Sequence, residues 1–378
     1  MKNALVFPLI AAVFVTTATT AIDVPYSTRM IESVMSRKQG VVSSGAATST
    51  LESGVLTLAI QSWLSMYSKC NDSKRVTNFA AYADSIVASV STSFTDPTVT
   101  VTKPLDRLAI GQALLNIKVT LGTLTTAQTD TLSTLDESLI LQNRNANGGF
   151  WYYVYPYWSY VDGTFSFLPY MATAPGWSYE DMLLQIELLY LNTYDKNTGL
   201  VVHGYDASKT AVWANKVTGG SPYVWGRALG WYLSGLVNAW EQLGSCKGGS
   251  DTACLRLAST IQTQANQLCK RIITYADAAT GVWWQLPTLG AKQGNFLESS
   301  STMLYTFAIL KGLRLGLLKE DSRSTLDWEG TVAICSLNST ATYEYYVGRP
   351  IVRNHALGEG AFILASLEVE QVARFGKH

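Results

Sequence analysis

The sequences TGLVVH (residues 198–203) and TGVWWQ (residues 280–285) follow one pattern, a Thr-Gly turn and then a short β-rich run. The stretch GGFWY (residues 148–152) resembles both. Each run is followed by a loop, a helix that carries polar residues, and a second, more uniformly apolar helix. Repeats of this kind bury their apolar faces against their neighbours. The pattern therefore predicts helical hairpins joined by short β-rich loops.

Helical periodicity dominates the rest of the chain. Candidate helices cover residues 27–38, 53–69, 76–91, 104–120, 124–142, 162–173, 179–193, 225–243, 252–274, 298–316, 321–336 and 357–373. Six hairpins closed in a circle use all twelve helices and explain one domain larger than the usual limit of about 250–300 residues. We therefore predict an all-α fold over residues 22–378, an (α/α)6 barrel or six-hairpin toroid. An open α-solenoid is the alternative, but its repeats are usually shorter and more regular.

The first 21 residues have the features of a secretory signal peptide. Lys2 gives a basic start, residues 4–15 are apolar, and small residues lead to a cleavage site after Ala21. The apolar run is short for a membrane span of about 20 residues, so a signal anchor is the less favoured alternative. We predict that residues 1–21 are removed and that the protein is secreted into the extracellular space.

The composition argues against several classes of partner. The 28 basic residues equal the 28 acidic residues in number, so there is no basic excess to bind nucleic acid. No stretch after the signal is long and apolar enough to cross a bilayer. The chain has three histidines, and no Cys/His spacing resembles a metal site. We expect no metal or other cofactor, and the sequence leaves the oligomeric state open.

Exported chains commonly form disulfides and carry glycans. Cys246 and Cys254 flank a Gly/Ser-rich turn and can close a short loop. The total of five cysteines leaves at least one without an intrachain partner. Asn71 and Asn338 begin glycosylation sequons, although such triplets also arise by chance.

Polar residues recur where a helix opens. Asp106, Asp162, Arg227 and Glu298 all occupy the loop or first turn of an expected helix. When a repeat places polar side chains at the same end of successive helices, these side chains surround a central pocket, which we call the pit. This arrangement predicts an enzyme more strongly than any single motif.

Asp162 is the leading candidate for a general acid. It follows a very aromatic run, and a carboxyl walled by aromatic rings near another carboxylate has its pKa raised toward the working pH. Asp106 is the candidate second carboxylate. The alternative for both is an N-cap role, which such positions invite.

The helix over residues 225–243 is expected to start near Ser221, a plausible N-cap, with Pro222 in its first position. Arg227 and Trp231 are i, i+4 neighbours on the face opposite its apolar stripe, so we expect them to face the pit. A cation and a stacking ring are what a sugar carboxylate requires. A structural Arg–aromatic pair is the alternative.

His203 is expected on a strand, where alternation puts it on one face with Val201 and Tyr205. A lone histidine is more often a structural group than a catalyst. Glu298 most simply opens a helix, where its charge suits the dipole. His355 and Glu359, near the last helix, are weaker candidates.

Five segments in order resemble glycoside hydrolase family 105, the unsaturated rhamnogalacturonyl hydrolases, which are related to the unsaturated glucuronyl hydrolases of family 88. The segments are VDGTFSFLPYM (residues 161–171), TGLVVHGYD (198–206), WGRALGW (225–231), NFLESSS (295–301) and GEGAFILA (358–365). The resemblance covers most of the mature chain and implies an (α/α)6 barrel. Many members of the family lack a signal peptide, whereas this chain has the features of an exported protein.

The resemblance implies that Asp162 is the catalytic acid/base and that Asp106 is a second aspartate at the pit. It implies that His203, Arg227 and Trp231 hold an unsaturated uronic acid, the residue that polysaccharide lyases leave at a chain end. The expected reaction hydrates its C4=C5 double bond without a metal. A conventional inverting glycosidase using both aspartates, a non-catalytic carbohydrate-binding protein and a structural toroid are the alternatives.

Overall fold

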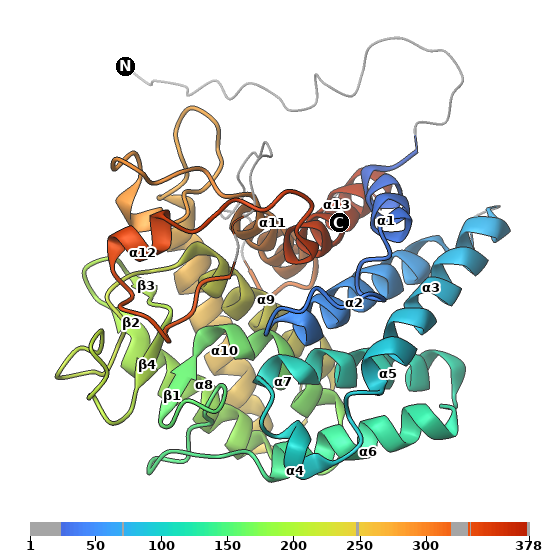
Figure 1. Cartoon of the computed structure of the whole chain (residues 1–378), viewed down its shortest axis with the longest axis horizontal. Helices are drawn as coiled ribbons and strands as arrows, with labels where there is room; N and C mark the ends of the chain where they lie inside the picture. Colours follow the sequence, from blue (N-terminus) through green and yellow to red (C-terminus); the bar gives the residue numbers. More distant parts are fainter. Residues whose placement is uncertain (1–23, 70–71, 247–248, 319–331, 333, 376–378) are drawn as a thin grey trace.

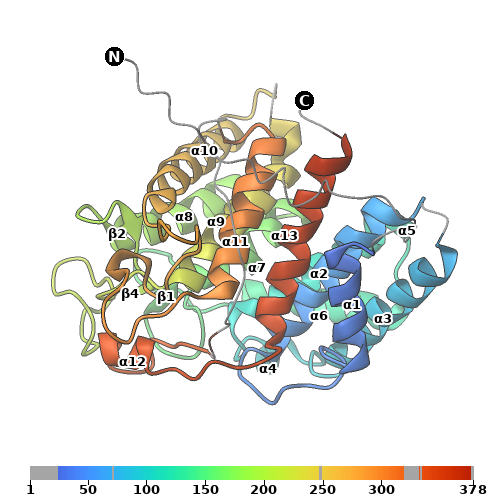
Figure 2. The ribbon, with the colours of Figure 1, turned by 90° about the horizontal axis from the view of Figure 1, so that it is seen from above.

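Six helices form a closed ring in the computed structural model, which describes residues 24–69, 72–246, 249–318, 332 and 334–375 (Figure 1). In chain order they are α2 (Ser49–Tyr67), α5 (Leu108–Leu121), α7 (Thr164–Thr173), α9 (Gly226–Gln242), α11 (Ser299–Arg314) and α13 (Ala356–Phe375). Each packs against the next, and α13 returns to pack against α2. The contact between α11 and α13 is visible in Figure 2, where the two run side by side.

A second set of helices covers this ring from outside. These helices are α1 (Tyr26–Ser36), α3 (Ser73–Ser91), α6 (Thr126–Ile140), α8 (Tyr179–Thr193) and α10 (Thr252–Ile273). The helices α3, α6, α8 and α10 each pack on the inner helix that precedes them, and α1 packs against α13 and α2. The alternation of inner and outer helices confirms the predicted (α/α)6 barrel.

Glycines lie where neighbouring inner helices touch. A Cβ atom on Gly54 of α2 would overlap Ala109 of α5, and one on Gly235 of α9 would overlap the backbone of Thr164 at the start of α7. Gly360 of α13 faces α2 in the same way. The missing side chains let these helices approach one another closely, and at Gly235 the approach is backbone to backbone.

The axis of the ring is a packed core. Ala109, Phe165, Trp231, Leu304 and Leu357 come from five different inner helices and belong to one buried apolar cluster. Trp231 is 1% exposed, and its ring centroid lies 4.6 Å from that of Phe165. The barrel interior is therefore filled by side chains.

Short strands lie at one side of the ring. Strand β1 (Trp158–Tyr160) pairs antiparallel with β4 (Gly204–Asp206), and β2 (Tyr194–Asp195) pairs with β3 (Leu200–Val201). The short helix α12 (Tyr343–Val347) lies on the same side as β1 and β4 in both views (Figures 1 and 2). Two one-turn 3-10 helices, η2 (Leu105–Arg107) and η3 (Val161–Gly163), lead directly into α5 and α7.

Two local expectations are wrong. Helix α9 begins at Gly226 and not at Pro222, because the Ser221 N–H donates to the Gly204 carbonyl at 2.9 Å and so pairs with β4. The helix expected at residues 321–336 lies largely outside the described residues, and its described end, at 332 and 334–336, is not helical.

The predicted signal peptide, residues 1–21, lies outside the described residues, and the domain boundary at residue 22 stays a prediction. In the part of the chain that the structure describes, every helix is too short or too polar to traverse a lipid bilayer.

Candidate active site

Three tight turns begin the segments that build the site. Each contains a glycine in the left-handed region, with φ of +87°, +72° and +73°, and a polar residue follows four positions later. The glycines are Gly148, Gly199 and Gly281, and the polar residues are Tyr152, His203 and Gln285. We call the segments 148–152, 199–203 and 281–285 the return segments, because each comes back to the start of the inner helix of its own hairpin.

The return segments hold those helix starts through the backbone. The carbonyls of Tyr152, His203 and Gln285 accept hydrogen bonds of 2.9, 3.1 and 3.0 Å from the N–H groups of Leu105, Val161 and Gly226, respectively. The residue after each of these N–H groups is Asp106, Asp162 or Arg227. The repeat seen in the sequence therefore fixes all three candidate residues by one equivalent contact.

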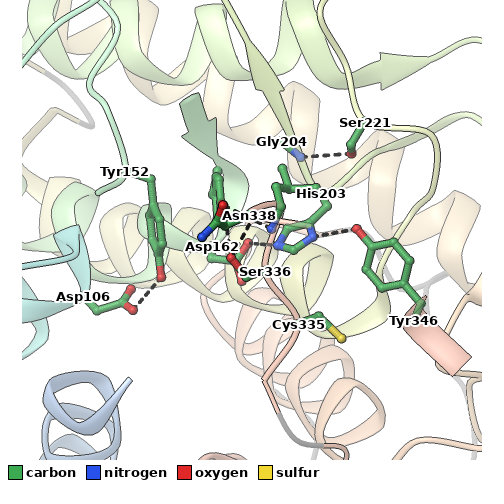
Figure 3. A network of polar contacts seen from close by, with 12 residues as sticks. Asp106, Tyr152, Asp162, His203, Gly204, Ser221, Cys335, Ser336, Asn338 and Tyr346 are labelled. Atoms are coloured by element: carbon green, nitrogen blue, oxygen red, sulfur yellow. Dashed lines mark hydrogen bonds and ion pairs between the residues drawn. The ribbon is translucent and has the colours of Figure 1, made fainter. Parts of the chain in front are cut away.

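Asp106 lies in η2 and is completely buried. Its Oδ2 accepts a hydrogen bond from the Tyr152 hydroxyl at 2.6 Å, while Oδ1 has no partner among the described residues (Figure 3). Burial raises the pKa of Asp106 to about 7, even though the Tyr152 hydrogen bond acts to lower it. The negative charge of Asp162 also raises this pKa, so the two carboxyls are electrostatically coupled.

Asp162 lies in η3 and is 7% exposed. Helix α7 begins without a side-chain cap hydrogen bond, and so does α5, so the N-cap interpretation is wrong for both aspartates. The Asp162 Oδ2 lies 3.4 Å from Nε2 of His203. Asp162 is therefore buried, lies beside a polar side chain and does not cap the helix that follows it.

His203 is completely buried in the bend between β3 and β4, and not within a strand as expected. Its Nδ1 lies 2.8 Å from the Tyr346 hydroxyl, so the imidazole sits between that phenol and Asp162 (Figure 3). The rings of Tyr160 and Trp225 pack against it, with centroid distances of 5.2 and 4.7 Å. These contacts allow the imidazole little freedom to rotate.

Arg227 and Trp231 are not the stacked pair that the sequence suggested. The ring beneath the Arg227 guanidinium is that of Trp225, 4.9 Å away, and Nη1 donates to the Val332 carbonyl at 2.7 Å. Trp231 belongs to the axial core, where Phe165 covers its ring. The expectation that Trp231 faces an open pit fails in this structure because an inner helix is buried on all sides, and its contact with substrate stays a prediction.

The other acidic candidates have structural partners. Glu298 accepts hydrogen bonds from the N–H groups of Ser300 and Ser301 at 3.2 and 2.7 Å, which confirms the interpretation of Glu298 as the opening residue of α11. Glu359 forms an ion pair with Arg37, the residue that follows α1.

Several residues of the site were not predicted. Tyr152 and Gln285 occupy the position of His203 in the return segments, and counting four residues from the first glycine of GGFWY would have found Tyr152. Tyr346 comes from a segment 143 residues further along the chain and carries no sequence signal.

The structure also describes possible metal ligands, one pair of cysteines and one of the two glycosylation sequons. Among the residues that the structure describes, no three His, Cys, Asp or Glu side chains come together as a metal site. The expected disulfide between Cys246 and Cys254 is present, with Cα atoms 5.6 Å apart. Asn338 is exposed and donates to the Tyr155 hydroxyl at 3.2 Å, whereas Asn71 lies outside the described residues. Glycosylation at both positions stays a prediction.

Comparison with known proteins identifies the family to which this fold and site belong. The family model for Glycosyl Hydrolase Family 88 matches residues 26–373. A "24.9 kDa protein in picA locus" of Rhizobium radiobacter is 31% identical over 225 residues, which span 52% of this chain and 92% of that protein. A glycoside hydrolase of family 105 from C. acetobutylicum has a similar structure, with a TM-score of 0.75 and 25% identity over 92% of this chain and 100% of the other.

The fold also resembles that of the unsaturated glucuronyl hydrolase from Bacillus sp. GL1, with a TM-score of 0.53 and 10% identity over 75% of each chain. The barrel and the family match together define a glycoside hydrolase that acts on an oligosaccharide. More particularly, this chain belongs to Glycosyl Hydrolase Family 88, and its structural neighbours include members of family 105.

Proposed function

We propose that this glycoside hydrolase is secreted and removes a terminal 4,5-unsaturated uronic acid from oligosaccharides that polysaccharide lyases release. The uronic acid is of the galacturonyl or glucuronyl type, as in fragments of pectin, rhamnogalacturonan or glycosaminoglycans. Membership of family 88 and the activity of the Bacillus neighbour, an unsaturated glucuronyl hydrolase responsible for glycosaminoglycan degradation, support this substrate class.

One observation carries the proposal, the pair of buried carboxyls Asp106 and Asp162 at the starts of neighbouring inner helices. Neither is used to cap a helix. The pKa of Asp106, raised to about 7 by burial, lets it keep its proton at mildly acidic pH. The pair then carries less than its full negative charge, which suits a site that must deliver a proton.

In the proposed reaction, Asp162 takes up a proton from solvent and then gives it to C4 of the unsaturated sugar. The electron pair of the C4=C5 bond forms the new C–H bond, and positive charge develops at C5, where the ring oxygen shares it. Water then adds to C5 as the Asp162 carboxylate takes one of its protons. The resulting hemiketal opens, and the hemiacetal left at C1 expels the neighbouring sugar. Positioned proton transfer typically contributes about 10²–10⁴-fold to such a rate.

Arg227 supplies the positive charge of the proposed binding site. Arg227 is 1% exposed and its guanidinium is held over Trp225, so a sugar carboxylate that reaches it exchanges water for a charge-assisted hydrogen bond. Such a bond contributes about 1.5–3 kcal/mol, enough to select an acidic sugar over a neutral one. His203 lies beside Asp162 and is proposed to bind the same sugar. The buried ring of Trp231, which packs against Phe165, is proposed to support this site from the axial core.

The proposed export rests on the signal-like residues 1–21 and is supported by the Cys246–Cys254 disulfide, because such bonds persist in oxidising compartments. Expression in a secreting host tests it. The protein should appear in the medium with its N-terminus near Ile22, and retention of the intact chain inside cells would contradict export.

Offering saturated and unsaturated forms of the same uronyl disaccharides tests the activity. We expect only the unsaturated forms to be consumed, with loss of the ultraviolet absorbance of their double bond and release of the neighbouring sugar. Cleavage of the saturated forms would favour a conventional inverting glycosidase. Binding without turnover would favour a carbohydrate-binding protein. Galacturonyl and glucuronyl substrates compared in one panel would define the specificity.

A further inference from the structure

Tyr346 is fixed at both ends by two residues that occupy equivalent positions in the return segments. Its hydroxyl lies 2.8 Å from Nδ1 of His203, and its backbone carbonyl accepts a hydrogen bond from Nε2 of Gln285 at 3.3 Å. The side chain is completely buried on the short helix α12, and the rings of Trp225 and Tyr223 lie beside it. Tyr346 is therefore a rigid partner for the imidazole.

The two nitrogens of His203 face partners of different chemistry. Nδ1 faces the Tyr346 hydroxyl, which can donate or accept, whereas Nε2 faces a carboxyl oxygen of Asp162 at 3.4 Å. If the proton were on Nδ1, the lone pair of Nε2 would point at the Asp162 carboxylate and repel it. If the proton is on Nε2, the N–H attracts the carboxylate, and Tyr346 completes the arrangement by donating to Nδ1.

We propose that Tyr346 is a positioning residue that holds His203 in its Nε2–H tautomer, so that this N–H points at Oδ2 of Asp162 and fixes the proposed acid/base carboxyl. The inference rests on the proposed function for its catalytic consequence, but not for the tautomer itself. A distance of 3.4 Å is long for a hydrogen bond, and such contacts often shorten when substrate binds.

The other ionisable groups around the imidazole do not disturb this arrangement. They are the phenols of Tyr346 and Tyr160 and the thiol of Cys335, which lies below His203 in Figure 3. Burial raises the pKa of both phenols well above their ordinary value, and it raises the pKa of Cys335 to about 12. All three therefore keep their protons at neutral pH, and the Tyr346 hydroxyl retains the proton that it donates to Nδ1.

Nitrogen NMR of the protein labelled with 15N in its histidine rings reads the tautomer directly. The chain has three histidines, and the signals of His203 are those that disappear in a His203→Gln variant. At neutral pH we expect a protonated Nε2 and an unprotonated Nδ1. A proton on Nδ1, or on both nitrogens, would overturn the proposal, and this measurement does not depend on enzymatic activity.

The Tyr346→Phe variant removes only the hydroxyl. We expect the His203 signals to move toward a mixture of tautomers and kcat on an unsaturated uronide to fall about tenfold, the equivalent of one lost hydrogen bond, with little change in KM. The matched control is Tyr343→Phe on the same helix, because the Tyr343 hydroxyl donates to the backbone carbonyls of Lys292 and Gln293. That variant should leave the His203 signals and kcat unchanged.

The outcomes separate this inference from the proposed function. If Tyr346→Phe leaves both the tautomer and kcat as in the unaltered protein, Tyr346 is not a positioning residue. If His203 shows the Nε2–H tautomer but the protein consumes no unsaturated uronide, the positioning is correct and the proposed function is wrong.

Discussion

The hairpin α2–α3 differs from the hairpins α5–α6, α7–α8 and α9–α10 in the way it ends. Each of the three ends in a return segment whose left-handed glycine brings the chain back to the start of its own inner helix. After α3, none of residues 92–104, all of which the structure describes, has a positive φ, and the chain runs on to α5. The first turn of α2 contains a buried carboxyl, Glu52, but this accepts a hydrogen bond from Thr48 at 3.0 Å. A buried carboxyl at a helix start therefore does not by itself mark a candidate site, and the three candidate positions Asp106, Asp162 and Arg227 all have a return segment beside them.

The largest expected effect is on activity, and it appears when a carboxyl beside a return segment, Asp162, is compared with one that has no return segment, Glu52. Asp162→Asn should leave a folded protein whose activity on unsaturated uronides falls by about 10²–10⁴-fold, because the group that transfers the proton is lost. Glu52→Gln is the matched control in the hairpin without a return segment and should retain nearly full kcat. Rates of absorbance loss for both variants, with circular dichroism to verify folding, provide the measurement. Substantial turnover by Asp162→Asn would reject the assignment.

The next effect is the pH dependence of stability at Asp106. Its pKa is about 7 in the folded protein against an ordinary value of 3.8, so the folded state binds the proton more tightly. The stability contributed by this proton is present below about pH 4 and is lost as pH rises toward 7, on the order of 1 kcal/mol per pH unit. Asp106→Asn lacks this loss, so it should gain stability relative to the unaltered protein across that window.

Urea unfolding at a series of pH values measures this difference. The control is Asp181→Asn. Burial acts to raise the pKa of Asp181, but hydrogen bonds from Arg144 and Gln185 outweigh it and lower the pKa, so its transition lies below pH 4. A difference between Asp106→Asn and the unaltered protein that stays constant from pH 4 to 7 would contradict the raised pKa.

A smaller effect is expected at the far end of the α9–α10 hairpin. The Cys246–Cys254 disulfide spans a sequence separation of 8 where the two helices join, away from the return segment. Replacing both cysteines with serine should lower the free energy of unfolding by about 2–3 kcal/mol, the loop-closure entropy of so short a ring. Activity at low temperature should not change, and a large loss of kcat would show that the two ends of the hairpin are coupled.

The smallest expected effect is a difference in kcat between substitutions at two glycines that both have a positive φ, Gly199 and Gly122. Gly199→Ala and Gly122→Ala both force an alanine into positive φ, of +72° and +77°, and each should cost about 1–2 kcal/mol of stability. Only Gly199 begins a return segment, whereas Gly122 ends α5 in open space. We expect a several-fold lower kcat for Gly199→Ala alone, measured beside thermal unfolding of both variants. Equal activities would mean that the return segment tolerates the strain.

The sequence predicted the barrel because its repeat and its helical periodicity are local properties. It also located Asp106 and Asp162, but it left their role open, because an aspartate that caps a helix and one that serves a site look alike in sequence. The contacts that separate the two roles come from distant segments, such as the Tyr346 hydroxyl beside His203. The position of Trp231 was misjudged for another reason. A helix surrounded by neighbours has no solvent face, so an apolar stripe on one side does not show what the other side meets.

The glycine contacts between inner helices have a consequence for the kind of polymer the enzyme can accept. Because backbones such as those at Gly235 and Thr164 touch and side chains fill the axis, the inner helices that the structure describes enclose a packed core and no tunnel. If Asp162 acts as proposed, a sugar bound beside it lies against this packed core, and a long polysaccharide is not expected to pass through the barrel. The proposed activity is therefore expected to remove sugars from the end of a chain, one residue at a time.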